Sequence, residues 1–306
     1  MLDLHRLRLL REVHGRGTVH AAARALGYTP SAISQQLSVL EREAGTALLE
    51  RVGRNVRLTA AGQVLVRHAG VLLEALETAE AELASVATGQ VAGVVRVAAF
   101  QSAFLHIVAP AIRALAASHP ELRVEATEAE LEQGTPALRL QQLDLVVGDQ
   151  YDGQPRPVHP ELHREVLLRE RIRIVLPHDH PAARADRVPL RQLADLPWSA
   201  SQPGTGHRAM QIRVCRQLGG FEPDLRYSSD DFLIQLELVR STGAGALLPD
   251  LLLATATDGV AVRSPAEGPV GREVFLLTRS SRTPAVAAVA AALRTAAAAR
   301  TGPIAG

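Results

Sequence analysis

The chain has 306 residues, a length typical of two domains or of one domain joined to a smaller module. Apolar residues make up 47% of it and charged residues 21%, which is ordinary for a folded protein and excludes a disordered or fibrous chain. The net charge is +1, but residues 1–60 hold nine Arg against five acidic residues, whereas the remainder holds 24 Arg against 27. The basic N-terminal part alone therefore favours a polyanionic partner.

Several other classes of protein are disfavoured by composition. A single cysteine, Cys215, excludes an intramolecular disulfide and a cysteine-rich zinc site. The N-terminus is charged and lacks the apolar core of a signal peptide, and no run of 18 apolar residues occurs, so we expect a cytoplasmic protein without a membrane span. Nine aromatic residues are too few for a platform that stacks single-stranded nucleic acid.

The first forty-five residues show three helical patterns. Apolar residues at helical spacing predict an amphipathic helix over residues 3–14, which glycines 15 and 17 end. Thr18 is a good N-cap for a second, alanine-rich helix. After a short turn at Gly27 and Tyr28, Thr29 caps a third helix, with Pro30 at its first position.

The third helix has two chemically different faces. Ile33, Leu37 and Leu40 form an apolar face at i, i+4 and i+7. The opposite face carries short polar side chains with almost no charge: Ser31, Ser34, Gln35 and Ser38. Such a face suits hydrogen bonding to base edges in a major groove, which makes this a helix-turn-helix pattern. The alternative is an ordinary helical hairpin with a solvated face, which a charged surface would favour.

A small β-wing is predicted after Gly45. Two short apolar segments flank the turn formed by residues 53–55. Three arginines, Arg51, Arg54 and Arg57, then become candidate phosphate contacts, which hold register without reading sequence.

Residues 18–62 resemble the winged helix-turn-helix of LysR-type transcriptional regulators. The matching motifs are Ala22-Ala23, Ala32-Ile33-Ser34, Leu40-Glu41, Gly45, Arg51 and Leu58-Thr59 through Gly62. The sequence departs from the family pattern at Leu49, where Phe is usual, which is an apolar exchange. The resemblance implies that Pro30, Ser31, Ser34 and Gln35 face the bases, and Thr29 is a further candidate DNA-binding residue. The resemblance also implies that Gln36 and the wing arginines face phosphates.

A long helix is predicted from the cap Thr59 to about Ala87. Leu65, Leu72, Ala79 and Val86 repeat every seven residues, and Ala69, Leu76 and Leu83 fill the intervening positions. This seam is typical of a coiled coil of about 40 Å. The family resemblance implies that the helix pairs with a second copy, giving a homodimer or homotetramer that reads a two-fold-related operator on double-stranded DNA. The alternative is a helix lying on its own domain core.

Residues 92–300 alternate between strand-like and helical segments, which predicts an α/β fold with a mainly parallel sheet. Strands are expected at 94–98, 122–126, 143–147, 172–176, 197–201, near 227, at 244–248 and at 272–278. Helices are expected around 104–115, 136–143, 207–218 and 232–240 and at the alanine-rich C-terminus.

This region resembles the effector domain of LysR-type regulators, two α/β subdomains like those of periplasmic binding proteins. The matching segments are residues 143–147, 175–181 and 243–249. The resemblance implies three parts. They are a winged helix-turn-helix at 1–59, a linker helix at 60–88 and an effector domain at 92–300, with subdomain I at 92–163 and 268–300 and subdomain II at 164–267.

Ligands of open α/β sheets bind beyond the carboxyl ends of strands, where helix N-termini favour anions. The candidate effector-binding residues follow predicted strands or open helices: Gln101, Ser102, Thr127, Asp149, Ser201, Gln202, Thr205 and Ser229. Each of them also suits a simple helix cap. A carboxylate effector is one expectation, and nearby acidic residues suggest a cationic or amino-acid effector as the other.

Three further signals are weaker. Residues 204–209 fit a dinucleotide fingerprint but occur late in the chain, and Asp224, about twenty residues on, does not end a clear strand. His178-Asp179-His180 supplies too few converging ligands for a metal. Alternating acids at 125, 128 and 130 are typical of a solvated edge rather than an acid/base pair. No catalytic motif is found, so we expect no enzyme, no metal and no cofactor.

The sequence thus predicts a DNA-binding transcription regulator controlled by a small-molecule effector bound between the two C-terminal subdomains. One alternative is a small-molecule binding protein whose N-terminal module serves protein contacts. An enzyme built on the α/β domain is the other alternative, which lacks a converging catalytic set.

Overall fold

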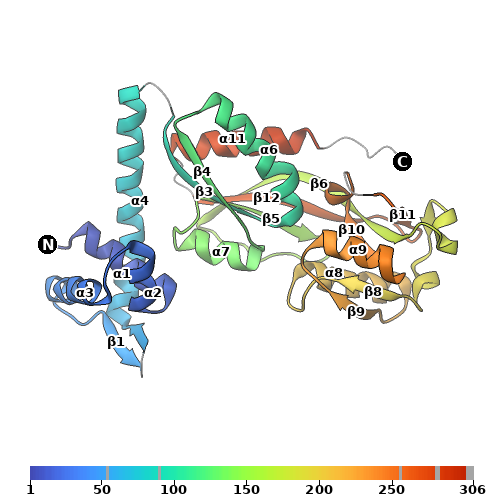
Figure 1. Ribbon diagram of the computed structural model, residues 1–306, viewed down its shortest axis with the longest axis horizontal. Coiled ribbons are helices and arrows are strands. Elements are labelled where there is room, and N and C mark those ends of the chain that lie inside the picture. The colour runs from blue at the N-terminus through green and yellow to red at the C-terminus, as the bar shows by residue number, and fades with distance from the viewer. Residues whose placement is uncertain (53–54, 89–90, 255–256, 280–282, 301–306) are drawn as a thin grey trace. The chain divides into compact units, whose positions relative to one another are not determined.

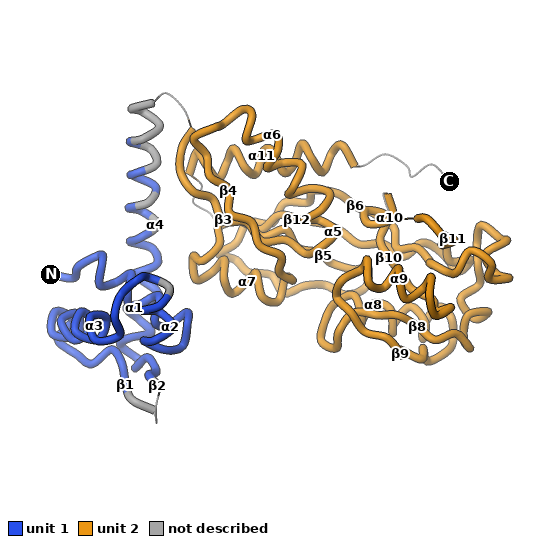
Figure 2. The backbone as a smooth tube through the Cα atoms, in the orientation of Figure 1, with its two compact units in different colours: residues 1–89 blue, residues 90–306 orange. Residues whose placement is uncertain are grey.

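A computed structural model of the chain describes residues 1–52, 55–88, 91–254, 257–279 and 283–300. The chain forms two compact units, residues 1–89 and residues 90–306, which are coloured separately in Figure 2. Across the described ranges, no helix is both long enough and apolar enough to cross a membrane.

The first unit is a winged helix-turn-helix followed by a long helix. Its elements are α1 (Leu4–Arg16), α2 (Val19–Leu26), α3 (Pro30–Ala44), β1 (Leu49–Val52), β2 (Asn55–Leu58) and α4 (Ala60–Thr88). The predicted caps are confirmed, because the hydroxyls of Thr18 and Thr29 accept the N–H groups of Ala21 and Ala32. Helix α1 runs through the expected stop at Gly15 and ends at Gly17, whose φ of 74° is the left-handed conformation that favours glycine.

The wing is held to the helices by polar contacts and one close approach. The Glu41 carboxylate accepts the backbone N–H groups of Leu48 (2.9 Å) and Leu49 (3.1 Å). The Thr59 hydroxyl donates to the carbonyl of Ala47 and accepts the N–H of Gly62, which caps α4 as predicted. A Cβ atom at Gly62 would lie 2.1 Å from the Leu48 carbonyl oxygen, so only glycine fits there.

Helix α4 packs through only part of its apolar surface. Ala69 and Leu73 are buried in the unit, and the helix contacts α1. Leu72 and Leu83, both on the predicted seam, are 47% and 70% exposed. The seam residue Val86 has a side chain outside the described set.

The second unit is built on an eight-stranded sheet (Figure 1). Its strands are β3 (Gly93–Ala99), β4 (Leu122–Glu128), β5 (Leu145–Tyr151), β6 (Leu162–Pro177), β7 (Arg187–Val188), β10 (Ala246–Pro249), β11 (Val260–Pro265) and β12 (Val270–Arg279), with β8 (Pro197–Ala200) and β9 (Asp224–Ser228) pairing separately. Its α-helices are α5 (Gln101–Ala103), α6 (Ala109–Ser118), α7 (Leu131–Arg139), α8 (Gly206–Val214), α9 (Phe232–Thr242), α10 (Asp250–Leu253) and α11 (Pro284–Ala298).

The sheet is mixed, which corrects the expectation of a mainly parallel one. Strand β3 pairs in parallel with β4 and β5, as a βαβ unit requires. The long strands β6 and β12 pair antiparallel with each other, and β12 also pairs antiparallel with β5. The two long strands β6 and β12 are therefore neighbours that run in opposite directions, and α11 follows β12.

Alternation along the central strands separates two apolar layers. Val97, Val147 and Leu276 pack in the cluster that holds α6 and α11, whereas Ala98, Val146 and Phe275 pack in the cluster that holds α7. Figure 1 shows α6 and α11 together on one face of the sheet and α7 on the other. Two further clusters cover the β6 end, one with α8 and Trp198 and one with α9 and α10.

Several predicted boundaries were wrong. Helix α7 spans Leu131–Arg139 rather than 136–143, and Pro136 lies inside it rather than at its start. Strand β6 is 16 residues long rather than five, because its first ten residues alternate with Arg and Glu and hide the apolar pattern. Strands β7 and β11 and helix α10 were not predicted.

Candidate DNA interface and effector pocket

The polar face of α3 is exposed as predicted. Ser31, Ser34, Gln35 and Ser38 are all exposed, and Ile33, Leu37 and Leu40 on the opposite face are 1%, 3% and 0% exposed. Ser34 and Gln35 have no hydrogen-bond partner among the described side chains. These two side chains are therefore free to form hydrogen bonds with a ligand of α3.

Other residues predicted to touch DNA already have partners in the chain. The Thr29 hydroxyl caps α3 and lies 3.1 Å from the Ser31 hydroxyl, and Pro30 occupies the first helical position. Arg57 of β2 donates twice to the Glu50 carboxylate. The Arg51 side chain and the whole of Arg54 lie outside the described set.

Gln36 is anchored by the first helix. Its Oε1 atom accepts a hydrogen bond from Nε of Arg6 at 3.0 Å, and Arg6 also pairs with Glu43 at 2.7 Å. Arg6 thus fixes α3 against α1 and orients the Gln36 amide group, whose Nε2 donors remain available.

A small pocket lies in the second unit at the carboxyl ends of β3 and β5. Its free volume is about 10 Å³, close to what one water molecule needs. The lining residues come from segments on both sides of β6 and from β12: Phe100, Gln101, Glu130, Asp149, Tyr151, Ser201, Thr205, Gly206, His207, Asp230, Phe232 and Arg272.

Four of the eight predicted effector residues line this pocket, namely Gln101, Asp149, Ser201 and Thr205. Ser102 is fully buried behind it and accepts a hydrogen bond from Arg272 at 2.7 Å.

The structure does not bring the other three to the pocket. Thr127 is exposed on β4. The Gln202 side chain donates to the Ser228 carbonyl, and the Ser229 hydroxyl accepts the N–H of Asp231. Gln202 and Ser229 therefore stabilise their own loops, which agrees with the alternative that they serve only as caps.

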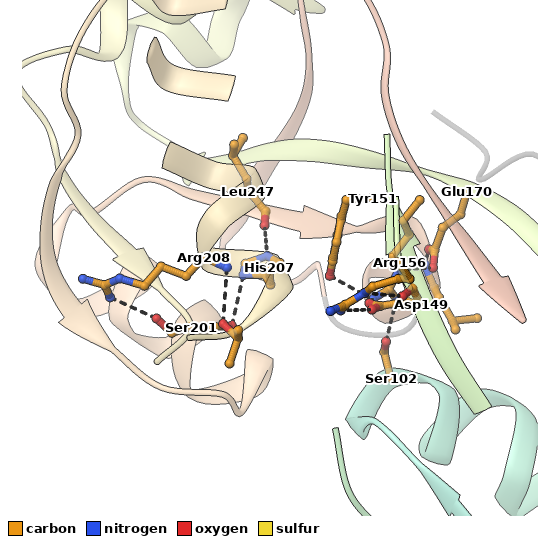
Figure 3. A network of polar contacts seen from close by, with 12 residues as sticks. Ser102, Asp149, Tyr151, Arg156, Glu170, Ser201, His207, Arg208 and Leu247 are labelled. Carbon is orange, nitrogen blue, oxygen red and sulfur yellow. Dashed lines mark hydrogen bonds and ion pairs between the residues drawn. The ribbon is translucent and has the colours of Figure 1, made fainter. Parts of the chain in front are cut away.

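Arg272 is the centre of the pocket floor, and sequence reasoning missed it. Its side chain is fully buried, with Nε 2.7 Å from Glu170 and one terminal nitrogen 3.1 Å from Asp149. Figure 3 labels three of its partners, Ser102, Asp149 and Glu170. The guanidinium carbon lies 4.7 Å from the Phe100 ring centre. Burial alone lowers the pKa of Arg272, but Glu170, Tyr151 and Asp149 raise it above its ordinary value, so the charge is permanent. The only sequence signal was a charge inside an apolar strand.

His207 closes the other side of the pocket. Its Nε2 lies 2.7 Å from the Leu247 carbonyl oxygen and its Nδ1 lies 3.0 Å from the Ser201 hydroxyl. A carbonyl only accepts, so Nε2 carries the proton and Nδ1 accepts from Ser201. Burial lowers the pKa of His207 to about 4, which keeps the ring neutral near pH 7.

Glu130 precedes α7 and lines the same pocket without an ion pair or hydrogen bond from its carboxylate to any described residue. Burial, reinforced by Asp149, Glu132 and Asp230, raises its pKa to about 7. Arg156 bridges Glu132 (2.6 Å) and Asp149 (3.5 Å) and does not neutralise Glu130. Arg272 partly offsets the rise in the pKa of Glu130, and neither Glu130 nor Asp230 forms an ion pair with a described residue.

The weaker motifs of the sequence have structural roles. Thr205, within the dinucleotide-like segment, caps α8, and Asp224 begins β9. The His180 ring accepts the N–H of Ala182 and so caps a 3₁₀ turn. No cluster of three metal-ligating side chains occurs in the described ranges. Cys215 is buried, and burial raises the pKa of its thiol to about 12.

Both parts of the chain match family profiles. Residues 4–63 match the bacterial regulatory helix-turn-helix protein, lysR family, and residues 88–298 match the LysR substrate binding domain. The transcriptional dual regulator GltC of Bacillus subtilis is 28% identical over 284 residues, covering 92% of both chains. MetR of Salmonella typhimurium is 29% identical over 81% of this chain and 75% of its own.

Solved structures show the same fold. A full-length OxyR variant from Pseudomonas aeruginosa aligns with a TM-score of 0.74 at 21% identity, covering 100% of this chain and 97% of that one. CbnR complexed with its target DNA aligns with a TM-score of 0.61 at 22% identity, covering 96% and 100%.

The chain belongs to the LysR family of transcriptional regulators. It is a DNA-binding regulator of transcription with an N-terminal helix-turn-helix and a C-terminal substrate-binding domain.

Proposed function

We propose that α3 reads base edges through Ser34 and Gln35, with Ser31 and Pro30 at the start of the helix in contact with the same groove. The free, uncharged face supports this role, because hydrogen bonds to base edges need donors and acceptors without partners. Gln36, oriented by Arg6, and the three wing arginines 51, 54 and 57 bind phosphates, and Arg57 does so by exchanging its contact with Glu50.

The effector binds in the pocket around Arg272. The single observation that carries this proposal is that residues before β6, residues after it and one residue of β12 meet in one pocket. A ligand there contacts Gln101, Asp149, Ser201 and Thr205 at once. Because the free volume holds only about one water molecule, binding requires the two sides to separate.

The charges of the pocket favour an effector with a positive group. Arg272 is already satisfied by Glu170, Asp149 and Ser102, so a carboxylate has to displace one of them. Glu130 and Asp230 line the pocket without an ion pair to a described residue. An ammonium or guanidinium group relieves their repulsion, and a carboxylate on the same molecule can accept the N–H groups at the start of α8, as an amino acid would.

In this proposal, effector binding in the pocket changes DNA binding through the way in which copies of the protein assemble. The predicted seam of α4 pairs two copies, which presents two α3 helices to a two-fold-related operator, and a tetramer pairs two such dimers. The proposed parts are the winged helix-turn-helix at 1–59, the linker helix at 60–88 and the effector domain at 92–300. Within the effector domain, subdomain I is 92–163 with 268–300 and subdomain II is 164–267. The protein acts in the cytoplasm as a regulator rather than an enzyme, and its pocket needs no cofactor.

Thermal unfolding of the full-length protein with small amines, amino acids and carboxylates tests the pocket. An effector is expected to raise the midpoint of the wild type and to lose most of that effect in Thr205→Val or Glu130→Gln. An effector that stabilises all three proteins equally binds elsewhere and contradicts the assignment. The preference for a positive group is contradicted if a carboxylate binds best to the wild type and binds still more tightly to Glu130→Gln.

A further inference from the structure

A second, larger cavity in the same unit shares no lining residue with the Arg272 pocket. Its free volume is about 250 Å³, room for a small organic ion rather than a single water. Strands β6, β7 and β11 and the turn before β12 form its wall, through Arg171, Ile172, Arg173, Arg187, Ser264, Pro265 and Pro269. Every charged residue in this lining is an arginine.

Only one of these three arginines is neutralised. Arg173 donates to both carboxylate oxygens of Asp250, at 2.7 and 3.3 Å, and to the Ser264 hydroxyl at 2.6 Å. Arg187 donates only to the carbonyl of Ala266, at 3.1 Å. Arg171 has no hydrogen bond or ion pair with another residue in the described part of the chain. Two of the three arginines in the lining, Arg171 and Arg187, are therefore without an ion pair.

The register of the strands aligns these side chains. Ser264 of β11 lies opposite Arg187 of β7, and its hydroxyl meets Arg173 of β6, so the three residues form one row across the sheet. Arg171 lies two residues along β6, hence on the same face as Arg173. Strand β11 separates β6 from β7, so the backbones of Arg171 and Arg187 are about 10 Å apart across the sheet, and the long side chains of both line the same cavity.

The rim of the cavity is held in place. The Glu267 carboxylate accepts the N–H of Leu190 at 2.9 Å and ties the turn after β11 to the neighbouring 3₁₀ turn. Pro265 and Pro269 supply an apolar wall beside the charges. Guanidinium groups that line one cavity can bind an oxyanion through paired hydrogen bonds, and here Arg173 is fixed by its partners whereas Arg171 and Arg187 have free donors.

We propose that this cavity binds a small anion with at least two acidic oxygens, held by Arg171, Arg187 and the Arg173–Ser264 pair. Phosphate and dicarboxylates share that chemistry. The site is separate from the Arg272 pocket, so it gives the effector domain a second small-molecule input, and it does not depend on where the effector binds.

Isothermal titration calorimetry of the full-length protein tests the proposal, with sodium phosphate and sodium succinate as probes and chloride adjusted to constant ionic strength. We expect saturable binding of at least one probe. The variant R171Q/R187Q is expected to weaken binding at least tenfold. R113Q, which removes an exposed arginine of α6, is the matched control and is expected to bind as the wild type does. Binding of both probes indicates general recognition of dianions, and binding of phosphate alone indicates a phosphoryl site.

Two results overturn the proposal. One is the absence of saturable binding of either probe to the wild type. The other is unchanged binding in R171Q/R187Q, which places the bound anion elsewhere on the protein. The thermal midpoint in chloride checks that the double variant is folded. If it is not, R187Q alone, whose side chain is exposed, replaces it with an expected loss of at least threefold.

Discussion

Arg272 of β12 lies directly opposite Glu170 of β6, and the two buried side chains form an ion pair of 2.7 Å. The same guanidinium group reaches Asp149 on β5 and Ser102 in α5. One side chain thus connects the two long neighbouring strands β6 and β12 with the proposed effector pocket that it lines. Its partners lie 102, 123 and 170 residues away in sequence.

Replacing Arg272 with Met is expected to destabilise the protein by about 3–5 kcal/mol, because the carboxylates of Glu170 and Asp149 are left buried without their cation. Urea unfolding at pH 7 measures the change. The variant R272M/E170M removes both partners and is expected to recover part of the loss. A single variant that unfolds like the wild type would show that the pair does not stabilise the domain.

His207 predicts a loss of stability in mild acid. Its pKa is about 4 in the folded protein and 6.5 as a free group, so between these values the unfolded chain binds a proton that the folded chain does not. Stability from this residue is complete above pH 6.5 and falls as the pH drops toward 4, by on the order of 3 kcal/mol. Denaturant unfolding from pH 7.5 to 4 should show a shallower dependence in His207→Gln, and parallel curves would refute this.

Glu130 predicts the opposite sign over an overlapping range. Its pKa is raised from 4.5 to about 7, so the folded protein binds a proton between these values and is stabilised as the pH falls. The variant Glu130→Gln removes this contribution. The decline of stability from pH 7 to 4.5 should therefore be steeper in the variant than in the wild type, and an equal or shallower decline would contradict the burial of the carboxyl group.

Cys215 is expected to be inert in the folded protein. It is fully buried and the pKa of its thiol is raised to about 12, so almost no thiolate is present at pH 8. Mass spectrometry after treatment with iodoacetamide should show an unmodified native protein and a modified urea-unfolded one. Rapid labelling of the native protein would place the thiol at the surface.

The exposed part of the α4 seam, which includes Leu72 and Leu83, predicts an association through that helix, whereas Ala69 of the same seam packs in its own unit. Leu83→Glu is expected to weaken the dimer on the order of 100-fold, because it places a carboxylate in an apolar contact. Val71→Glu introduces the same charge at a 61% exposed position off the seam and is the control. Sedimentation velocity over a range of concentrations separates them. An equal effect of the two variants would argue against the seam.

Local signals explain why much of the fold could be predicted. Thr18, Thr29 and Thr59 cap helices where the sequence placed the caps, since a cap is a contact over three residues. Period-two and helical patterns located most strands and helices of the second unit. The rule that proline occupies the start of a helix gave a wrong prediction at Pro136, which lies inside α7.

The candidate site was less predictable because long-range contacts make it. Gln101 and Ser201 could be identified because they follow the ends of predicted strands. Arg272 and Tyr151 lie within strands, so their positions in the sequence did not mark them as pocket residues. His207 was predicted only as the first residue of the helix at 207–218, which begins at Gly206 in the structure. The antiparallel pairing of β6 with β12, which no local pattern encodes, is what brings Arg272 beneath these residues.

The most direct test of the account is fluorescence anisotropy of the full-length protein on DNA from upstream of its own coding sequence, with a random duplex of equal length, at two salt concentrations. We expect tight, salt-dependent binding with preference for the upstream duplex. In Gln35→Ala that preference is expected to fall by about 1–3 kcal/mol, while binding to random duplex is unchanged. Equal losses on both duplexes, or no binding by the wild type at low salt, would contradict base reading by α3.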